Sequence, residues 1–381
     1  MPTRLIFASS WRWVLGLLAL GLAGCVEPYV PEVISSPVSY LVVDGFINGN
    51  GVTRIRLSRT ENVAATTAPP VERGAKLVML DEQGTRYSLT EKSAGLYQSD
   101  SLQLPTGRRY QLRITTAGAR AANYESDLVE LKLTPPIDKV RWRLDGEQVQ
   151  VLVSAHDATG QTRYYRWGFT ETWQFNSAFE SALEYNAALG QIVNRTTPIY
   201  TCWQTVRSSR IQQSTTAQLS QDALTDVQLL AISNRAERLR IRYSLLVTQV
   251  AETAQEFAYY ELLRKNTEAV GTVNDPLPVQ LTGNVHRTGT STTEPVLGYV
   301  GAHTVQQQRI FIDRADLPFP STWQFDSPYL TCQIDSMTED VFRTPAFVPI
   351  GHDPQAGTYY GSSRECLDCR VRGSNVKPSF W

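Results

Sequence analysis

Apolar and polar residues alternate along much of this chain, which is the pattern of β-strands. Residues 54–59, 110–115 and 239–247 show the alternation most clearly, with an apolar side chain at every second position. Successive side chains of a strand point to opposite faces of its sheet, so one face of each strand is buried and the other is exposed to solvent. Turn sequences separate these short strands, as in DEQG at 81–84 and PTG at 105–107. The pattern predicts a mainly β fold of the sandwich type.

Two consecutive prolines, Pro135 and Pro136, interrupt the strand pattern and mark a boundary between two domains. We expect an N-terminal β-sandwich over residues 38–134 and a second β-rich domain over residues 137–381. The short strands and frequent turns of both domains are typical of immunoglobulin-like or fibronectin-like sandwiches. Residues 174–233 are mixed and polar, and we expect them to form a long irregular insertion in the second domain.

One segment has the spacing of an amphipathic helix. Apolar side chains recur every three or four positions after residue 250, and the basic residues Arg264 and Lys265 suit the negative C-terminal end of a helix. We therefore predict a helix near residues 253–266 in the second domain. Its buried stripe is expected to consist of Val250, Ala254, Phe257, Ala258 and Leu262.

Residues 1–24 have the three parts of a secretory signal peptide. Arg4 and Arg12 make the start positive, an apolar run follows over residues 14–22, and small residues precede Cys25. The apolar run is shorter than the roughly 20 residues that a membrane-spanning helix needs. Cys25 directly after Leu-Ala-Gly resembles the lipobox of bacterial lipoproteins, which implies acylation of this cysteine, for example with palmitate. Residues 25–37 are then the lipidated cysteine and its tether.

The composition is that of a folded protein and excludes one class of partner. Of the 381 residues, 42% are hydrophobic and 10% are aromatic, which is more apolar than a disordered chain. The formal net charge is −1, so the chain lacks the positive field on which nucleic-acid binding depends. We therefore expect no nucleic-acid partner.

Sequence blocks spread over the chain resemble those of the lipoproteins grouped as domain of unknown function 4249, found in Bacteroidetes. The blocks follow the lipobox in one order, and the C-terminal block is the most specific: LVVDG at 41–45, WGFTETWQF at 167–175, RYSLLV at 242–247, LTGNV at 281–285, GYV at 298–300, CLDCR at 366–370 and GSNVKPSFW at 373–381. The resemblance implies an outer-membrane location, on the periplasmic or the cell-surface face, and a gene near TonB-dependent receptors. It implies no catalytic residue.

Four cysteines besides Cys25 remain in the mature chain, and an even number in an oxidising compartment favours disulfides. Of the three possible pairings, we favour long-range bridges that join Cys202 and Cys332 to the C-terminal pair Cys366 and Cys369. A metal site is less favoured because a second closely spaced ligand pair is missing. A redox role for the CxxC is less favoured because no thioredoxin-like βαβ pattern surrounds it.

The sequence contains no HExxH zinc motif and no GxSxG nucleophile elbow. We therefore expect no enzymatic activity, no bound metal and no cofactor. A hydrolase of the cell envelope that acts on glycan or peptide stays open as an alternative, because paired carboxylates need only lie close in space. Glu171, Glu180 and Glu184 are available for such a pair.

Aromatic residues gather at the start of the expected insertion: Trp173, Phe175, Phe179 and Tyr185. Core packing is the ordinary role of aromatic side chains near strands. Long insertions on a sandwich are nevertheless common binding surfaces, and we expect these four residues to contact a partner. The sequence thus predicts a lipid-anchored binding or accessory component of a TonB-dependent receptor or uptake complex. A structural or adhesion module of the cell surface is the second alternative.

Overall fold

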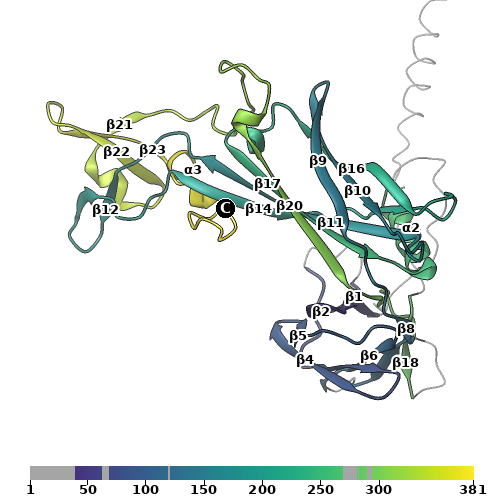
Figure 1. The fold of residues 1–381 in the computed structure, drawn as a ribbon. Coiled ribbons are helices and arrows are strands. Elements are labelled where there is room, and N and C mark those ends of the chain that lie inside the picture. The colour runs from purple at the N-terminus through teal and green to yellow at the C-terminus, as the bar shows by residue number, and fades with distance from the viewer. Residues whose placement is uncertain (1–38, 62–67, 119–120, 269–280, 282, 290–293) are drawn as a thin grey trace, which may run out of the picture.

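The computed structural model describes residues 39–61, 68–118, 121–268, 281, 283–289 and 294–381. The expected signal peptide, Cys25 and the tether lie outside the described residues. Within the described ranges, no helix is both long enough and apolar enough to cross a bilayer. The fold is mainly β, as the alternating pattern predicts, and consists of two sandwiches and a smaller C-terminal module (Figure 1).

The first sandwich is one sheet folded over a single core. Its strands are β1 (Leu41–Asn48), β2 (Val52–Arg59), β3 (Lys76–Asp81), β4 (Arg86–Ser93), β5 (Leu96–Ser101), β6 (Arg109–Thr115), β7 (Asn123–Ser126), β8 (Val129–Glu130), β18 (Val285–Thr288) and β19 (Ala302–His303). They follow the order β18-β7-β6-β3-β4-β5-β2-β1-β19, with β8 beside β6. The first half of β4 pairs with β3 and the second half with β5, so β4 connects the two layers. Leu41, Ile55, Leu77, Tyr97 and Leu112 fill the core between them.

Two short strands of this sandwich come from far along the chain. β18 pairs with β7, and β19 runs parallel to β1. Val285, Val300 and Ala302 belong to the core of the first sandwich. The expectation that every residue after 137 belongs to the second domain is therefore wrong for the segment that carries β18 and β19. Strands of four and two residues are too short to show an alternating pattern.

The second sandwich packs a three-stranded sheet against a five-stranded one. Its strands are β9 (Ile137–Asp145), β10 (Gln148–His156), β11 (Tyr164–Asn176), β14 (Thr201–Arg207), β15 (Gln212–Thr215), β16 (Ala223–Ser233), β17 (Arg242–Ala251) and β20 (Val305–Asp313). One sheet has the order β16-β10-β9, and the other has the order β14-β11-β17-β20 with β15 also paired to β11. Side chains such as Val151, Trp167, Tyr243 and Ile312 form the core between the two sheets.

Residues 174–233 are not the irregular insertion that their polarity suggests. They complete β11 and supply β14, β15 and β16, and β16 pairs with β10 along almost its whole length. The residues of β15 are Gln, Gln, Ser and Thr, and all four are half-buried. A strand of that composition shows no alternation of apolar and polar positions, so the sequence pattern does not reveal it.

The C-terminal module lies at the end of the second sandwich remote from the first (Figure 1). It contains the hairpin of β12 (Leu183–Asn186) and β13 (Gln191–Asn194), and a sheet of β21 (Asp335–Met337), β23 (Thr358–Ser363) and β22 (Phe347–Asp353). The helical turns α3 (Arg364–Leu367), η4 (Glu339–Arg343) and η5 (Cys369–Val371) belong to it, while η2 (Glu237–Leu239) and η3 (Arg314–Asp316) flank β17 and β20. Ile199, Val348 and Leu367 form its small core.

The predicted helix is present as α2 (Ala254–Glu268), but its buried face differs from the expected one. Ala254 and Ala258 are exposed, whereas Glu256 is only 1% exposed. The ring of Tyr260 covers Arg166 on β11, with the guanidinium carbon 4.1 Å from the ring centre. The expected apolar stripe is wrong because α2 packs on a buried ion pair, and apolar spacing does not reveal such a contact.

Buried ionisable groups join the two sandwiches beside α2. Arg166 donates hydrogen bonds to carboxyl oxygens of both Glu252 and Glu256. Glu256 lies against His303 of β19, which belongs to the first sandwich. Gly301 leaves room for this contact, since a Cβ atom there would lie 2.3 Å from Oε2 of Glu256. The junction therefore depends on the placement of a few charged groups as well as on apolar packing.

Candidate partner-binding surface

A hollow of about 500 Å³ opens where the C-terminal module meets the second sandwich. Its lining residues come from the end of β11, the segment before β14, the turn η2 and the loop before β21: Phe175, Asn176, Ser177, Ala178, Phe179, Tyr200, Glu237, Arg240, Ile241, Ser327, Tyr329, Leu330 and Cys332. A volume of this size accommodates a short peptide segment or a small molecule. We refer to this feature as the module hollow.

Two disulfides tie the walls of the module hollow. Cys202 on β14 is bonded to Cys369, and Cys332 in the lining loop is bonded to Cys366. This is one of the two pairings that join Cys202 and Cys332 to the C-terminal pair, as we favour from the sequence. The bonds close chain segments of 167 and 34 residues, so they tie the C-terminal tail to the sandwich and the loop to α3. The hollow therefore has covalently held walls.

The floor of the module hollow is closely packed, and its charged side chains Arg372 and Glu237 form an ion pair. Phe175 is 2% exposed, and the guanidinium of Arg372 lies 4.7 Å from the centre of its ring. Arg372 donates two hydrogen bonds to the Glu237 carboxylate, and these raise the pKa of the arginine. Arg372 also donates to the hydroxyl of Tyr329 at 3.1 Å. These contacts neutralise the charges of Arg372 and Glu237 within the wall and hold its aromatic rings in place.

The rim of the module hollow carries an exposed apolar side chain and an uncompensated cation. Leu330 is 87% exposed, the highest value among the large hydrophobic side chains of the described residues. Arg240 is exposed, and its guanidinium has no ion pair or hydrogen bond with any residue that the structure describes. A lone exposed leucine needs no explanation. Together, Leu330 and Arg240 place an apolar and a cationic side chain at the edge of one concave surface.

The structure separates the four aromatic residues that we expect to contact a partner. Phe175 and Phe179 line the module hollow, whereas Trp173 and Tyr185 do not. Phe175 is buried against Cys202 and Cys369, so the expectation of an exposed contact residue is wrong for it. Phe175 lies an even number of residues after the buried Trp167 and Phe169 of β11, so its side chain is on the same face of the strand as theirs.

The other three residues are only partly accessible. Trp173 packs against two core clusters, and its buried indole nitrogen has no hydrogen-bond partner in the described part of the chain. Phe179 packs against the small core of the C-terminal module. Tyr185 is half-buried on β12. Phe179 thus contributes both to the wall of the hollow and to the packing of the C-terminal module. Trp173 and Tyr185 are not among the lining residues of the hollow.

Two of the three carboxylates considered for hydrolysis are held in ion pairs. Glu171 accepts a hydrogen bond from the Tyr243 hydroxyl at 2.8 Å and pairs with Arg238. Burial, followed by the charge of Glu171, raises the pKa of Tyr243. Glu184 pairs with Arg195 at 3.2 Å, and Glu180 is exposed. Among the described residues, no group of three or more His, Cys, Asp or Glu side chains is placed to hold a metal ion.

Sequence reasoning misses the residues that form the rim. Leu330 lies in a loop without periodic pattern, two residues before Cys332, and Arg240 is one of 36 basic residues. Neither residue carries a local signal of its own. The nearby Cys332 is a sequence signal for this loop, because its disulfide to Cys366 ties the loop to α3.

The solved structures that this chain matches include three at 10–15% sequence identity. A DUF4785 family protein from Legionella pneumophila shares 10% identity, covers 55% of this chain and 52% of its own length, and has a TM-score of 0.19. A two-domain fibronectin type-III segment of chicken tenascin shares 10% identity over 56% of this chain and 92% of its own, with a TM-score of 0.16. The adhesin InvE of Yersinia pseudotuberculosis shares 15% identity over 56% and 55%, with a TM-score of 0.14.

This chain spans about half the length of the Legionella protein that it matches. At such TM-scores, the three structures say nothing about what this chain binds. No curated protein sequence matches it. A family model does match, and it is described as a domain of unknown function (DUF4249) and covers residues 26–309. Because this match includes well over half of the sequence, the chain belongs to the DUF4249 family.

Proposed function

We propose that this protein is a lipid-anchored binding component of the cell envelope, and that it holds a partner polypeptide in the module hollow. The partner is a TonB-dependent outer-membrane receptor or another protein of its uptake complex, and the protein itself catalyses no reaction. The observation that carries the proposal is the pair of Leu330 and Arg240 at the rim of a hollow with disulfide-tied walls.

The chemistry of the hollow specifies the segment that it binds. The lining aromatic rings accept an apolar side chain, and Leu330 adds apolar area at the rim. The charges of Glu237 and Arg372 cancel, so Arg240 leaves a net positive rim. A complementary segment therefore carries an apolar anchor next to an aspartate or glutamate. Because the walls are already fixed, binding loses little conformational entropy on this side.

The position of the hollow suits an anchored protein. The tether of residues 25–37 leads directly into the first sandwich, and it extends at most roughly 40 Å. The module hollow lies at the end of the second sandwich remote from the first (Figure 1). An anchor at one end and a binding surface at the other let the protein reach a neighbour in the same membrane.

Partner capture by four matched variants tests this function. Leu330→Ser and Arg240→Glu change the rim, while Leu219→Ser and Arg54→Glu change an exposed leucine and an exposed arginine elsewhere. After mild detergent extraction and pull-down, we expect the two rim variants to lose at least about tenfold of a stoichiometric envelope partner, as is typical when an interface anchor is truncated. Equal capture by all four variants contradicts the assignment of the module hollow. Turnover of glycan or peptide libraries by the pure protein contradicts the binding function.

Labelling with palmitate tests the anchor independently. We expect the mature protein to incorporate the label and to sediment with membranes, and Cys25→Ser to abolish both. One acyl chain holds a protein to a bilayer only marginally, so a stable membrane fraction requires the several chains of a bacterial lipoprotein. An unlabelled mature chain, or a Cys25→Ser variant that still sediments with membranes, contradicts the anchor.

A further inference from the structure

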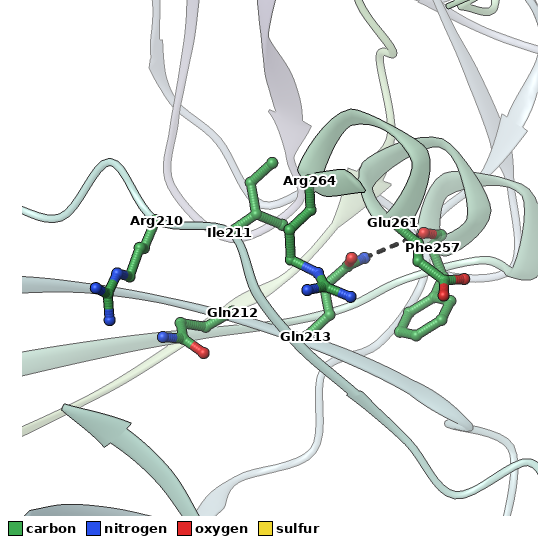
Figure 2. A pocket seen from close by; sticks show the side chains of 7 residues that line it. All are labelled: Arg210, Ile211, Gln212, Gln213, Phe257, Glu261 and Arg264. Atoms are coloured by element: carbon green, nitrogen blue, oxygen red, sulfur yellow. Dashed lines mark hydrogen bonds between the residues drawn. The ribbon is translucent and has the colours of Figure 1, made fainter. Parts of the chain in front are cut away.

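A second hollow, of about 620 Å³, lies between α2 and β15 and shares no lining residue with the module hollow. Figure 2 shows Arg210 and the glutamines of β15 on one side, and Phe257, Glu261 and Arg264 of α2 on the other. Most of these side chains are polar and planar. We refer to this feature as the α2 hollow.

Gln213 presents the α2 hollow with an unsatisfied acceptor. Its Nε2 donates to Oε2 of Glu252 at 2.6 Å. It also donates to the backbone carbonyl of Phe257 at 3.3 Å, as Figure 2 shows. Both partners are hydrogen-bond acceptors. A flipped amide would therefore place its oxygen against two other oxygens, so the oxygen must point away from them. That oxygen is buried and has no hydrogen-bond donor among the described residues. A buried acceptor without a donor is costly, and a ligand that donates a hydrogen bond removes the cost.

The charge of the α2 hollow favours an anion. Arg210 is exposed, and its guanidinium has no ion pair or hydrogen bond within the described part of the chain. Arg264 also lines the hollow, and the carboxylate of Glu261 is paired with Lys265 at 3.0 Å. Guanidinium groups only donate, so the ligand must bring acceptors to Arg210.

We propose that the α2 hollow binds a sugar acid, meaning a uronic acid or a short oligosaccharide that contains one. The carboxylate of the sugar pairs with Arg210, and a ring hydroxyl donates to the amide oxygen of Gln213. The apolar face of the sugar ring packs against Phe257, which is half-buried at the edge of the hollow. Such a ligand brings a carboxylate that accepts hydrogen bonds from Arg210 and hydroxyl groups that donate to the amide oxygen of Gln213. This binding site is separate from the partner-binding function proposed above.

Calorimetric titration of the detergent-solubilised full chain tests the proposal. The probes are trigalacturonic acid, neutral galactotriose and the peptide Ala-Glu-Ala, and the variants are Arg210→Ala and Arg207→Ala. Arg207 is an exposed arginine on β14 that does not line the hollow. We expect trigalacturonic acid alone to bind, and Arg210→Ala to weaken it roughly tenfold, as loss of one charged hydrogen bond does. Arg207→Ala should bind as the unchanged protein does.

Three results overturn the proposal. They are no heat of binding with trigalacturonic acid at about 10 mM, equal binding of the neutral trisaccharide, and equal affinity of the two arginine variants. Equal or tighter binding of the acidic peptide would reassign the α2 hollow to a peptide and also overturns it. Melting temperatures of both variants serve as the folding control. No change is expected, because both side chains are exposed and neither is paired with a residue that the structure describes.

Discussion

His303 of the first sandwich and Glu256 of α2 face each other across the junction, with 3.6 Å between Nδ1 and Oε2. Both side chains are almost completely buried, and this distance is too long for a hydrogen bond. Burial raises the pKa of Glu256 to about 8, although Arg166 acts in the opposite direction. Burial also lowers the pKa of His303 well below its usual range, and Arg166 lowers it further. Near neutral pH both groups are therefore uncharged.

The proton on Glu256 makes the stability of the fold depend on pH between about 4.5 and 8. Between pH 4.5, the ordinary value for a glutamate, and about pH 8, the folded chain keeps a proton that the unfolded chain releases. The free energy of unfolding therefore falls as the pH rises through this range. In Glu256→Gln this loss is absent, so the variant should gain stability relative to the unchanged protein as the pH increases.

Urea unfolding at pH 5, 7 and 9 measures this difference. Glu261→Gln is the matched control, because Glu261 is on the same helix but is 40% exposed in its ion pair with Lys265. We expect the gain from Glu256→Gln to grow with pH and the effect of Glu261→Gln to stay constant. Parallel pH profiles of Glu256→Gln and the unchanged protein would show that Glu256 is not protonated in the fold.

For His303 we expect the opposite pH dependence, a loss of stability as the pH falls below about 6.5. Its folded pKa is depressed, so below about pH 6.5 the unfolded chain binds a proton that the folded chain excludes. The free energy of unfolding therefore falls as the pH decreases from 6.5. His303→Gln cannot gain this charge and should lose less stability between pH 7 and pH 5. Melting temperatures at those two pH values check it, and an equal drop in both proteins contradicts the buried neutral histidine.

The two disulfides should contribute unequally to stability. In the chain-entropy model, a bridge across 167 residues stabilises by about 5 kcal/mol, and one across 34 residues by about 4 kcal/mol. We expect Cys202→Ser with Cys369→Ser to lower the free energy of unfolding more than Cys332→Ser with Cys366→Ser. The second pair of changes should also weaken partner capture, because Cys332 holds the loop of Leu330. If Cys332→Ser with Cys366→Ser captures the partner as well as the unchanged protein does, partner binding does not require a covalently held wall.

The last residue of the chain packs on the second sandwich. The ring of Trp381 lies 5.8 Å from that of Phe311 and 6.4 Å from that of Trp203, in edge-to-face geometry. Trp381→Ala should therefore cost about 2 kcal/mol, less than a fully buried aromatic residue would, because Trp381 is half-buried. Val376→Ala is the control in the same tail, since Val376 is 71% exposed. Equal melting temperatures of the two variants would contradict this packing.

The sequence predicts well where a regular pattern repeats over many residues. The alternation in residues 239–247 corresponds to β17, and the helix near residues 253–266 corresponds to α2. The preferred cysteine pairing also agrees with the structure. The strand and the helix follow from local periodicity, and four cysteines allow only three pairings. A single sequence is therefore sufficient to predict these features.

The features that the sequence does not predict depend on distant contacts. Glu256 is buried only because Arg166 and His303 arrive from two other strands, and its spacing on α2 gives no sign of this. The strand β19 has two residues and exists because β1 offers it a free edge. The rim of Leu330 and Arg240 likewise arises when a loop without a pattern is placed beside η2.

Site-specific photocrosslinking in intact cells identifies what contacts the module hollow. A photoreactive phenylalanine analogue replaces Leu330 at the rim of the module hollow, or Leu219, which is 49% exposed and outside it. We expect one dominant adduct with an outer-membrane protein from position 330 and none from position 219. No adduct at position 330, or the same adducts at both positions, would contradict the assignment of this hollow as the partner-binding surface.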